Sequence, residues 1–181
     1  MNIKFQQSGR SMVEMLGVLA IIGVLSVAGI AGYSKAMAHR NLNKTIDQAQ
    51  MIISNFMYYA QNTNNKSDMY NPNVINSLII PKEMLDSSNQ CRHALGGRCL
   101  VSQNTNGSQE FIVRFGDLDR EACIQLLILP YSEYAQKVSI NKIAQGPPLS
   151  SGNGKTKTGA ISIKDAASMC YDKQNAVRWH F

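Results

Sequence analysis

The sequence predicts an α+β protein, in which one long N-terminal helix precedes a globular head of strands and short helices. Three observations lead to this fold class. Residues 15–34 are 20 consecutive uncharged residues, and an apolar stripe at helical spacing follows them. Beyond residue 110, apolar and polar residues alternate as they do in strands with one buried face. A chain of 181 residues has room for one domain of ordinary size and an appendage.

Charge and cysteine content place broad limits on function. Lys and Arg outnumber Asp and Glu by 18 to 12, which gives a net charge of +6. This mild basicity fits an anionic surface but does not require nucleic acid as a partner. The four cysteines all lie between residues 91 and 170, outside the apolar segment. An even number of them indicates an oxidising compartment.

The first element is a single helix, apolar in its first half and amphipathic in its second. Residues 15–34 match the roughly 20 residues that a helix needs to cross about 30 Å of hydrocarbon. The amphipathic stripe follows at steps of three and four, through Ala38, Leu42, Ile46, Ala49, Ile53, Phe56 and Ala60. A helix from about Met12 to about Ala60 would be roughly 70 Å long, so its second half must leave the membrane. The polar run at 61–68 ends it.

The head is predicted to begin with a short helix and a strand. Asn71 and Pro72 fit a cap and first-turn pair for a helix through Leu78, which Pro81 closes. Residues 110–115 alternate as a strand does, with one buried face made by Phe111, Val113 and Phe115.

The second half of the head is predicted to hold a helix, a loop and a closing strand. Asp117 caps a helix over residues 118–129, which Pro130 ends. The composition of residues 145–159 is that of a flexible loop. The remaining elements are a short strand at 160–163, a helical turn at 165–172 and a terminal strand at 176–181. In that strand Val177, Trp179 and Phe181 share one face, which ties the C-terminus into the sheet and points His180 toward solvent.

Glu14 stands at the start of the apolar segment, where a carboxylate needs an explanation. Insertion scales put an acidic residue at about 2.5 to 3.5 kcal/mol at the centre of a membrane helix, and at less toward its end. A local explanation places Glu14 at the headgroup boundary, near the helix N-terminus and one turn from Arg10. The surrounding residues suggest a second explanation for Glu14, because the segment "GRSMVEMLGVLAIIGV" resembles the start of type IV pilins and pseudopilins. Precursors in that family have a short basic leader ending in glycine, then an apolar helix with glutamate as its fifth residue.

The resemblance implies a type IV pilin fold with three parts: a cytoplasmic leader at 1–9, a helix at 10–60 and a head at 61–181. A prepilin peptidase in the membrane would cut between Gly9 and Arg10 and N-methylate the new terminus. Glu14 would then neutralise the terminal amine of a neighbouring subunit in the filament core. Gly23 falls where the family often has a glycine that loosens the helix.

Two residues depart from the family pattern. Arg10 stands at the first mature position, where the family usually has Phe, Met or Leu. Its guanidinium can compete for Glu14 within the same helix, which affects both methylation and the partner of Glu14. Ala31 stands where the family commonly has proline, so a sharp kink is not expected there.

The C-terminal part is similar to the type IVb pilin group, in which a disulfide joins a helix of the head to the last part of the chain. That resemblance implies a disulfide between Cys123 and Cys170, which leaves Cys91 to pair with Cys99. A competing interpretation is a zinc site from Cys91, His93 and Cys99. Their spacing matches no common zinc pattern and a fourth ligand is missing, so neither a metal nor a cofactor is expected.

The predicted function is structural: a subunit of a bacterial type IV pilus. The histidines and cysteines form no nucleophile motif, so an enzyme is not expected. The implied partners are further copies of the chain in a helical homopolymer, the prepilin peptidase and the assembly platform of the inner membrane. The precursor would lie in the inner membrane with its head in the periplasm, and the mature subunit in an extracellular filament.

Three alternatives share the same N-terminal helix. They are a pseudopilin of a type II secretion system, a minor pilin, and a DNA-uptake pilin. DNA uptake would use basic side chains on the head, for which the candidates are Lys137, Lys142, Lys155, Lys157 and Lys164. Nucleic acid is therefore a conceivable partner but not a predicted one. Adhesion, motility, conjugation and DNA uptake use the same subunit design, so the sequence predicts the subunit and not its task.

Overall fold

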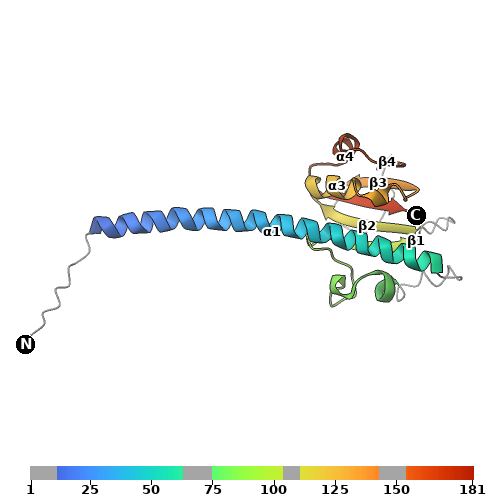
Figure 1. Ribbon diagram of the computed structural model, residues 1–181, viewed down its shortest axis with the longest axis horizontal. Helices are drawn as coiled ribbons and strands as arrows, with labels where there is room; N and C mark the ends of the chain where they lie inside the picture. The colour runs from blue at the N-terminus through green and yellow to red at the C-terminus, as the bar shows by residue number, and fades with distance from the viewer. Residues whose placement is uncertain (1–11, 63–74, 104–110, 143–153) are drawn as a thin grey trace, which may run out of the picture. The chain divides into compact units, whose positions relative to one another are not determined.

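The computed structural model describes residues 12–62, 75–103, 111–142 and 154–181 (Figure 1). The chain divides into two compact units, residues 1–40 and 41–181. Helix α1 (Met12–Asn62) begins in the first unit and ends in the second, as the sequence predicts for one uninterrupted helix. The leader and the cap at Asn71 and Pro72 lie outside the described residues.

The head contains a five-stranded sheet and several short helices. Its strands are β1 (Cys99–Gln103), β2 (Phe111–Leu118), β3 (Lys137–Lys142), β4 (Lys155–Lys157) and β5 (Asn175–His180). Its helices are the π-helical turn η2 (Ile75–Ile79), the 3-10 turns η3 (Lys82–Met84) and η4 (Pro130–Ser132), and the α-helices α3 (Arg120–Leu127) and α4 (Ile163–Met169). The strand order is β1-β2-β5-β3-β4, and every neighbouring pair is antiparallel.

Strand β5 occupies the centre of the sheet, between β2 and β3 (Figure 1). The prediction that the C-terminus is tied into the sheet is confirmed. The same position makes the prediction for His180 wrong. Its side chain is buried, and its Nε2 lies 2.9 Å from Ser139 Oγ on β3. Because β5 is central, cross-strand neighbours flank His180 on both sides, Ile112 of β2 and Lys137 of β3, so alternation alone does not place its side chain in solvent.

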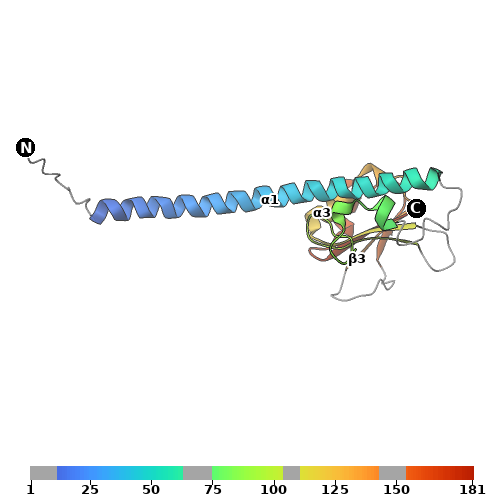
Figure 2. The ribbon, with the colours of Figure 1, turned by 90° about the horizontal axis from the view of Figure 1, so that it is seen from below.

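The second half of α1 covers one face of the sheet (Figure 2). Phe111, Val113 and Phe115 of β2 point to this face and are almost fully buried, as their alternation predicts. Phe56 of α1 stacks on Phe111 with ring centroids 4.1 Å apart. Trp179 of β5 is fully buried and meets Phe115 edge to face at 6.0 Å. The amphipathic stripe of the helix and the alternating strand thus build one common core.

The predicted start of α3 is wrong by two residues. Strand β2 continues to Leu118, and Asp117 lies within it at φ 57° instead of capping a helix. The cap is Asp119, whose side chain accepts a hydrogen bond of 2.7 Å from the backbone N–H of Ala122. Both aspartates fit the capping preference, and the length of the strand decides between them.

The region from residue 154 to residue 172 also differs from the sequence prediction. Residues 160–163 form no strand, because Ser162 is the N-cap of α4 and its side chain accepts a hydrogen bond from Asp165 N–H. A short strand instead lies at Lys155–Lys157, within the predicted loop, where it pairs with β3. Thr156 and its neighbours gain their extended structure from this pairing, which the local composition does not encode.

Candidate assembly site

The first half of α1 presents apolar side chains on all of its surface. The 12 large apolar residues from Met12 to Ile30 are each at least 50% exposed. By length and composition this stretch is able to cross a membrane. A contiguous apolar surface of this size marks a membrane or protein interface, because a protein in water cannot leave it uncovered.

Glu14 lies in the first turn of α1, where its carboxylate is exposed beside apolar neighbours. Gly9 and Arg10, the residues of the predicted cleavage site, lie outside the described residues. At Gly23 an added Cβ would meet no described atom within 4 Å, so no contact among the described residues requires glycine there. Among the described residues, both Glu14 and Gly23 therefore lie exposed on the helix surface, where a membrane or another molecule can contact them.

The loop from Cys91 to Cys99 packs against the second half of α1. A disulfide joins its two ends, with Cα atoms 5.0 Å apart. The buried side chains of Gln48 and Thr45 accept hydrogen bonds from the backbone N–H groups of Ala94 (2.8 Å) and Leu95 (3.3 Å). Sequence analysis missed this contact. A weak signal was present in Thr45, a polar residue at the edge of the apolar stripe, whereas the helical period places Gln48 among the polar residues of the other faces.

His93 is buried at the centre of this loop, 3% exposed. Its Nε2 lies 2.8 Å from the carbonyl oxygen of Gly116. A carbonyl oxygen can only accept a hydrogen bond, so Nε2 carries the proton. In the neutral ring Nδ1 is then unprotonated, and this buried atom has no hydrogen-bond partner among the described residues. Only glycine fits at position 97 beside this hydrogen bond, because a Cβ there would collide with His93 Nε2 and the Gly116 oxygen. The zinc alternative fails on its own ligands, since Cys91 and Cys99 are bonded to each other.

Burial lowers the pKa of His93 below its ordinary value, and the hydrogen bond to Gly116 opposes this only in part. In the unfolded chain His93 takes up a proton near pH 6.5, whereas in the folded chain it does so only at lower pH. The unfolded state thus binds more protons below about pH 6.5, and the free energy of unfolding must fall as the pH falls through this range.

We expect the urea midpoint of unfolding to decrease between pH 7.5 and pH 5, with a smaller decrease in His93→Phe. The fluorescence of Trp179, the one tryptophan of the sequence, reports unfolding of the head. His39→Gln is the matched control, since His39 is exposed on α1. An equal pH slope in the wild type and in His93→Phe would show that His93 is not the group responsible.

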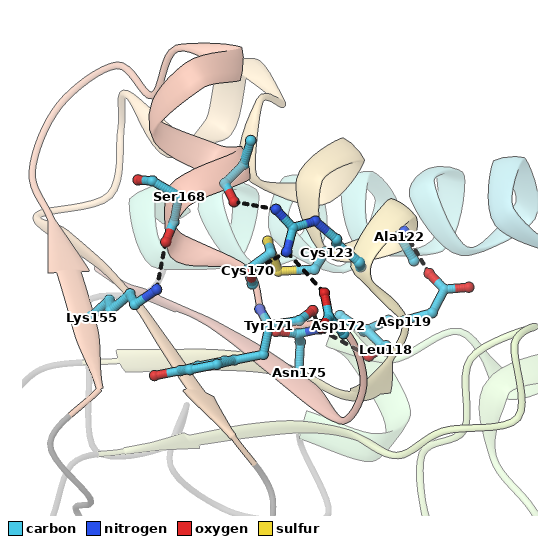
Figure 3. Close-up of a disulfide and its surroundings, with 12 residues drawn as sticks. Leu118, Asp119, Ala122, Cys123, Lys155, Ser168, Cys170, Tyr171, Asp172 and Asn175 are labelled. Atoms are coloured by element: carbon cyan, nitrogen blue, oxygen red, sulfur yellow. Dashed lines mark hydrogen bonds and ion pairs between the residues drawn. A yellow bond between two sulfur atoms is a disulfide. The ribbon is translucent and has the colours of Figure 1, made fainter.

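A second disulfide, Cys123–Cys170, joins α3 to the end of α4 (Figure 3). Arg120 reinforces the same junction, because its guanidinium donates to the carbonyl oxygens of Ala167 (2.9 Å) and Cys170 (3.2 Å) and pairs with Asp172. These two disulfides have the pairings given by the sequence analysis. The long one links elements that are separated by 47 residues.

Two of the lysines considered for DNA uptake have partners within the head. Lys157 pairs with Asp165, which lowers the pKa of that carboxyl to about 2. Lys155 donates to the carbonyl oxygen of Ser168 at 2.5 Å, and its ammonium lies 4.8 Å from the centre of the Tyr171 ring. Only Lys142 and Lys155 of the five line a shared groove, which Arg120 and Lys173 also border. The other three, Lys137, Lys157 and Lys164, lie on β3, β4 and α4.

Comparison with known proteins gives one family. A family model described as PilS N terminal matches residues 33–180, which is most of the chain. The match starts within α1 and ends at the last residue of β5. No curated protein matches the chain.

Proposed function

The chain belongs to the PilS N-terminal family, which is pilin-related, and from this premise we propose that it is a structural subunit of a bacterial type IV pilus. One observation carries the proposal. The first half of α1 is apolar and exposed over its whole surface, while the second half of the same helix is the core element of a folded head. A helix of this kind can hold the subunit in a membrane and then pack against its copies.

Within this proposal Gly9 and Arg10 flank the cleavage site, and Glu14 sets the register of assembly. The carboxylate would pair with the terminal amine of a neighbouring subunit. Two opposite charges at this depth offset each other, whereas either one alone would be left in an apolar filament core. The partners are then copies of this chain, the prepilin peptidase and the assembly platform.

The finer assignment is to the type IVb group. Its support is the Cys123–Cys170 disulfide, which joins a helix of the head to the segment before the last strand. We place the precursor in the inner membrane with the head in the periplasm, where disulfides form, and the mature chain in an extracellular filament. The role of the fold is structural, with the helices inside the filament and the heads outside.

Mass spectrometry of filaments sheared from cells, without reduction, tests the proposal. We expect a mature N-terminal peptide that begins at Arg10, and both disulfides intact. Replacing Gly9 by leucine is the control, because a bulky residue before the cut should leave the leader attached. A chain that keeps residues 1–9 and is absent from the sheared fraction would contradict the pilus role. A processed chain that stays with the cells would indicate a pseudopilin.

A further inference from the structure

The sheet face opposite α1 carries an unusual pair of arginines. Arg114 of β2 lies directly opposite Arg178 of β5 in the antiparallel register. Both alternate with residues that point toward α1, such as Val113 and Val177, so both side chains stand on the other face. Ser139 of β3 continues the row on the far side of Arg178.

These two guanidinium groups are in an unfavourable position. Directly opposed residues have Cβ atoms about 4.5 to 5.5 Å apart, and like charges at such positions destabilise a sheet. Both side chains are partly buried, which lowers the pKa of each below its ordinary value. The charge of Arg178 lowers the pKa of Arg114 further. The carboxylate of Asp117 raises this pKa, but its effect is the smallest of the three.

Two other arginines of the head carry ion pairs, and they show that Arg114 and Arg178 lack a carboxylate partner. Arg92 has the carboxylate of Asp86 at 3.0 Å, and Arg120 has that of Asp172 at 3.1 Å. Within the described residues, neither Arg114 nor Arg178 has a carboxylate at ion-pair distance. The Nε of Arg178 is buried, and it has no hydrogen-bond acceptor there.

We propose that Arg114 and Arg178 form a binding site for one oxyanion group, that is, a carboxylate, a sulfate or a phosphate. Guanidinium groups present their N–H donors in a planar fork that fits two oxygens of such a group. One anion between the two arginines satisfies the buried Nε and replaces a repulsion by two attractions. The group comes either from an acidic side chain of a neighbouring copy or from a free ligand, and both sources offer the same chemistry.

The first experiment uses the full chain in detergent micelles, with inorganic sulfate as the probe. Thermal unfolding is followed by Trp179 fluorescence in increasing sodium sulfate, and sodium chloride at equal ionic strength gives the reference. At a sulfate concentration ten times the dissociation constant, one site should raise the folded-to-unfolded ratio about elevenfold. The increase beyond chloride should saturate, as binding to one site does.

Three variants identify the arginines. Arg114→Gln and Arg178→Gln should each lose the saturable response to sulfate. In chloride both should unfold at the wild-type temperature or above it, because each removes one charge from a repelling pair. Arg40→Gln, the same change at an exposed position of α1, should keep the wild-type response. An equal response of the wild type and Arg178→Gln to sulfate would overturn the proposal, and so would a wild type that responds to sulfate no more than to chloride.

A second experiment separates the two sources of the anion and depends on the proposed pilus role. If a neighbouring copy supplies the carboxylate, Arg178→Gln should lower filament yield, and wild-type filaments should no longer bind sulfate. If the ligand is free, Arg178→Gln filaments should form normally and wild-type filaments should still bind sulfate. The micelle experiment requires no filament, so a failed pilus role and a failed oxyanion site give different results.

Discussion

Glu14→Ala is expected to leave a membrane-inserted chain that assembles at least about a hundredfold less filament than the wild type. In the proposed filament, the substitution would leave the amine of a neighbouring subunit uncompensated in an apolar core, and breaking a buried pair in this way costs about 3 to 5 kcal/mol. Each 1.4 kcal/mol changes an equilibrium about tenfold, so even the lower value gives a loss of this size. The measurement is the amount of chain in sheared filaments relative to the amount in the membrane.

Membrane insertion itself should not suffer, because alanine removes a carboxylate that is unfavourable in the apolar phase. Asp47→Ala is the matched control, since Asp47 is an exposed acid on the second half of the same helix. It should assemble as the wild type does. A normal filament yield from Glu14→Ala would mean that Glu14 does not set the register of assembly.

The second large effect is expected from the double substitution Cys123→Ala with Cys170→Ala. This disulfide closes a chain segment of 47 residues, and in the chain-entropy model its loss costs about 4 kcal/mol. For a head of this size such a loss lowers the unfolding temperature by about 10 to 15 °C. Trp179 fluorescence during heating, without reductant, measures the shift.

The short disulfide supplies the comparison. Cys91→Ala with Cys99→Ala opens a loop with a sequence separation of 8, and the same model gives about 2.5 kcal/mol. We therefore expect a smaller shift from this pair of substitutions. An equal or larger shift would indicate that the packing of the short loop on Gln48 and Thr45, and not loop closure, dominates its contribution.

Local sequence patterns predicted those features that depend only on the period of a single helix or strand. The helix α1 follows from the apolar segment and the stripe through Phe56, because both repeat with the period of the helix itself. The burial of Phe111, Val113 and Phe115 follows from the period of a strand. The cap of α3 did not follow, since Asp117 and Asp119 satisfy the same local rule and only the pairing of β2 with β5 distinguishes them.

Strand pairing also decided which residues form the proposed oxyanion site. Arg114 and Arg178 lie 64 positions apart, and nothing in either local sequence indicates the other. The register of β2 with β5 brings them together. The same central position of β5 buries His180, which alternation alone had placed in solvent.

The sequence by itself determined the long helix, the place of Glu14 at its start and the family resemblance. The helix follows from a local period, and the resemblance follows from the order of residues within its first turns. Only the tertiary structure decided the sheet order, the contact of the 91–99 loop with α1, and the arginine pair. These depend on contacts between segments far apart in the chain. Such contacts are selected by packing and hydrogen bonding of the whole head, and no periodicity in the sequence records them.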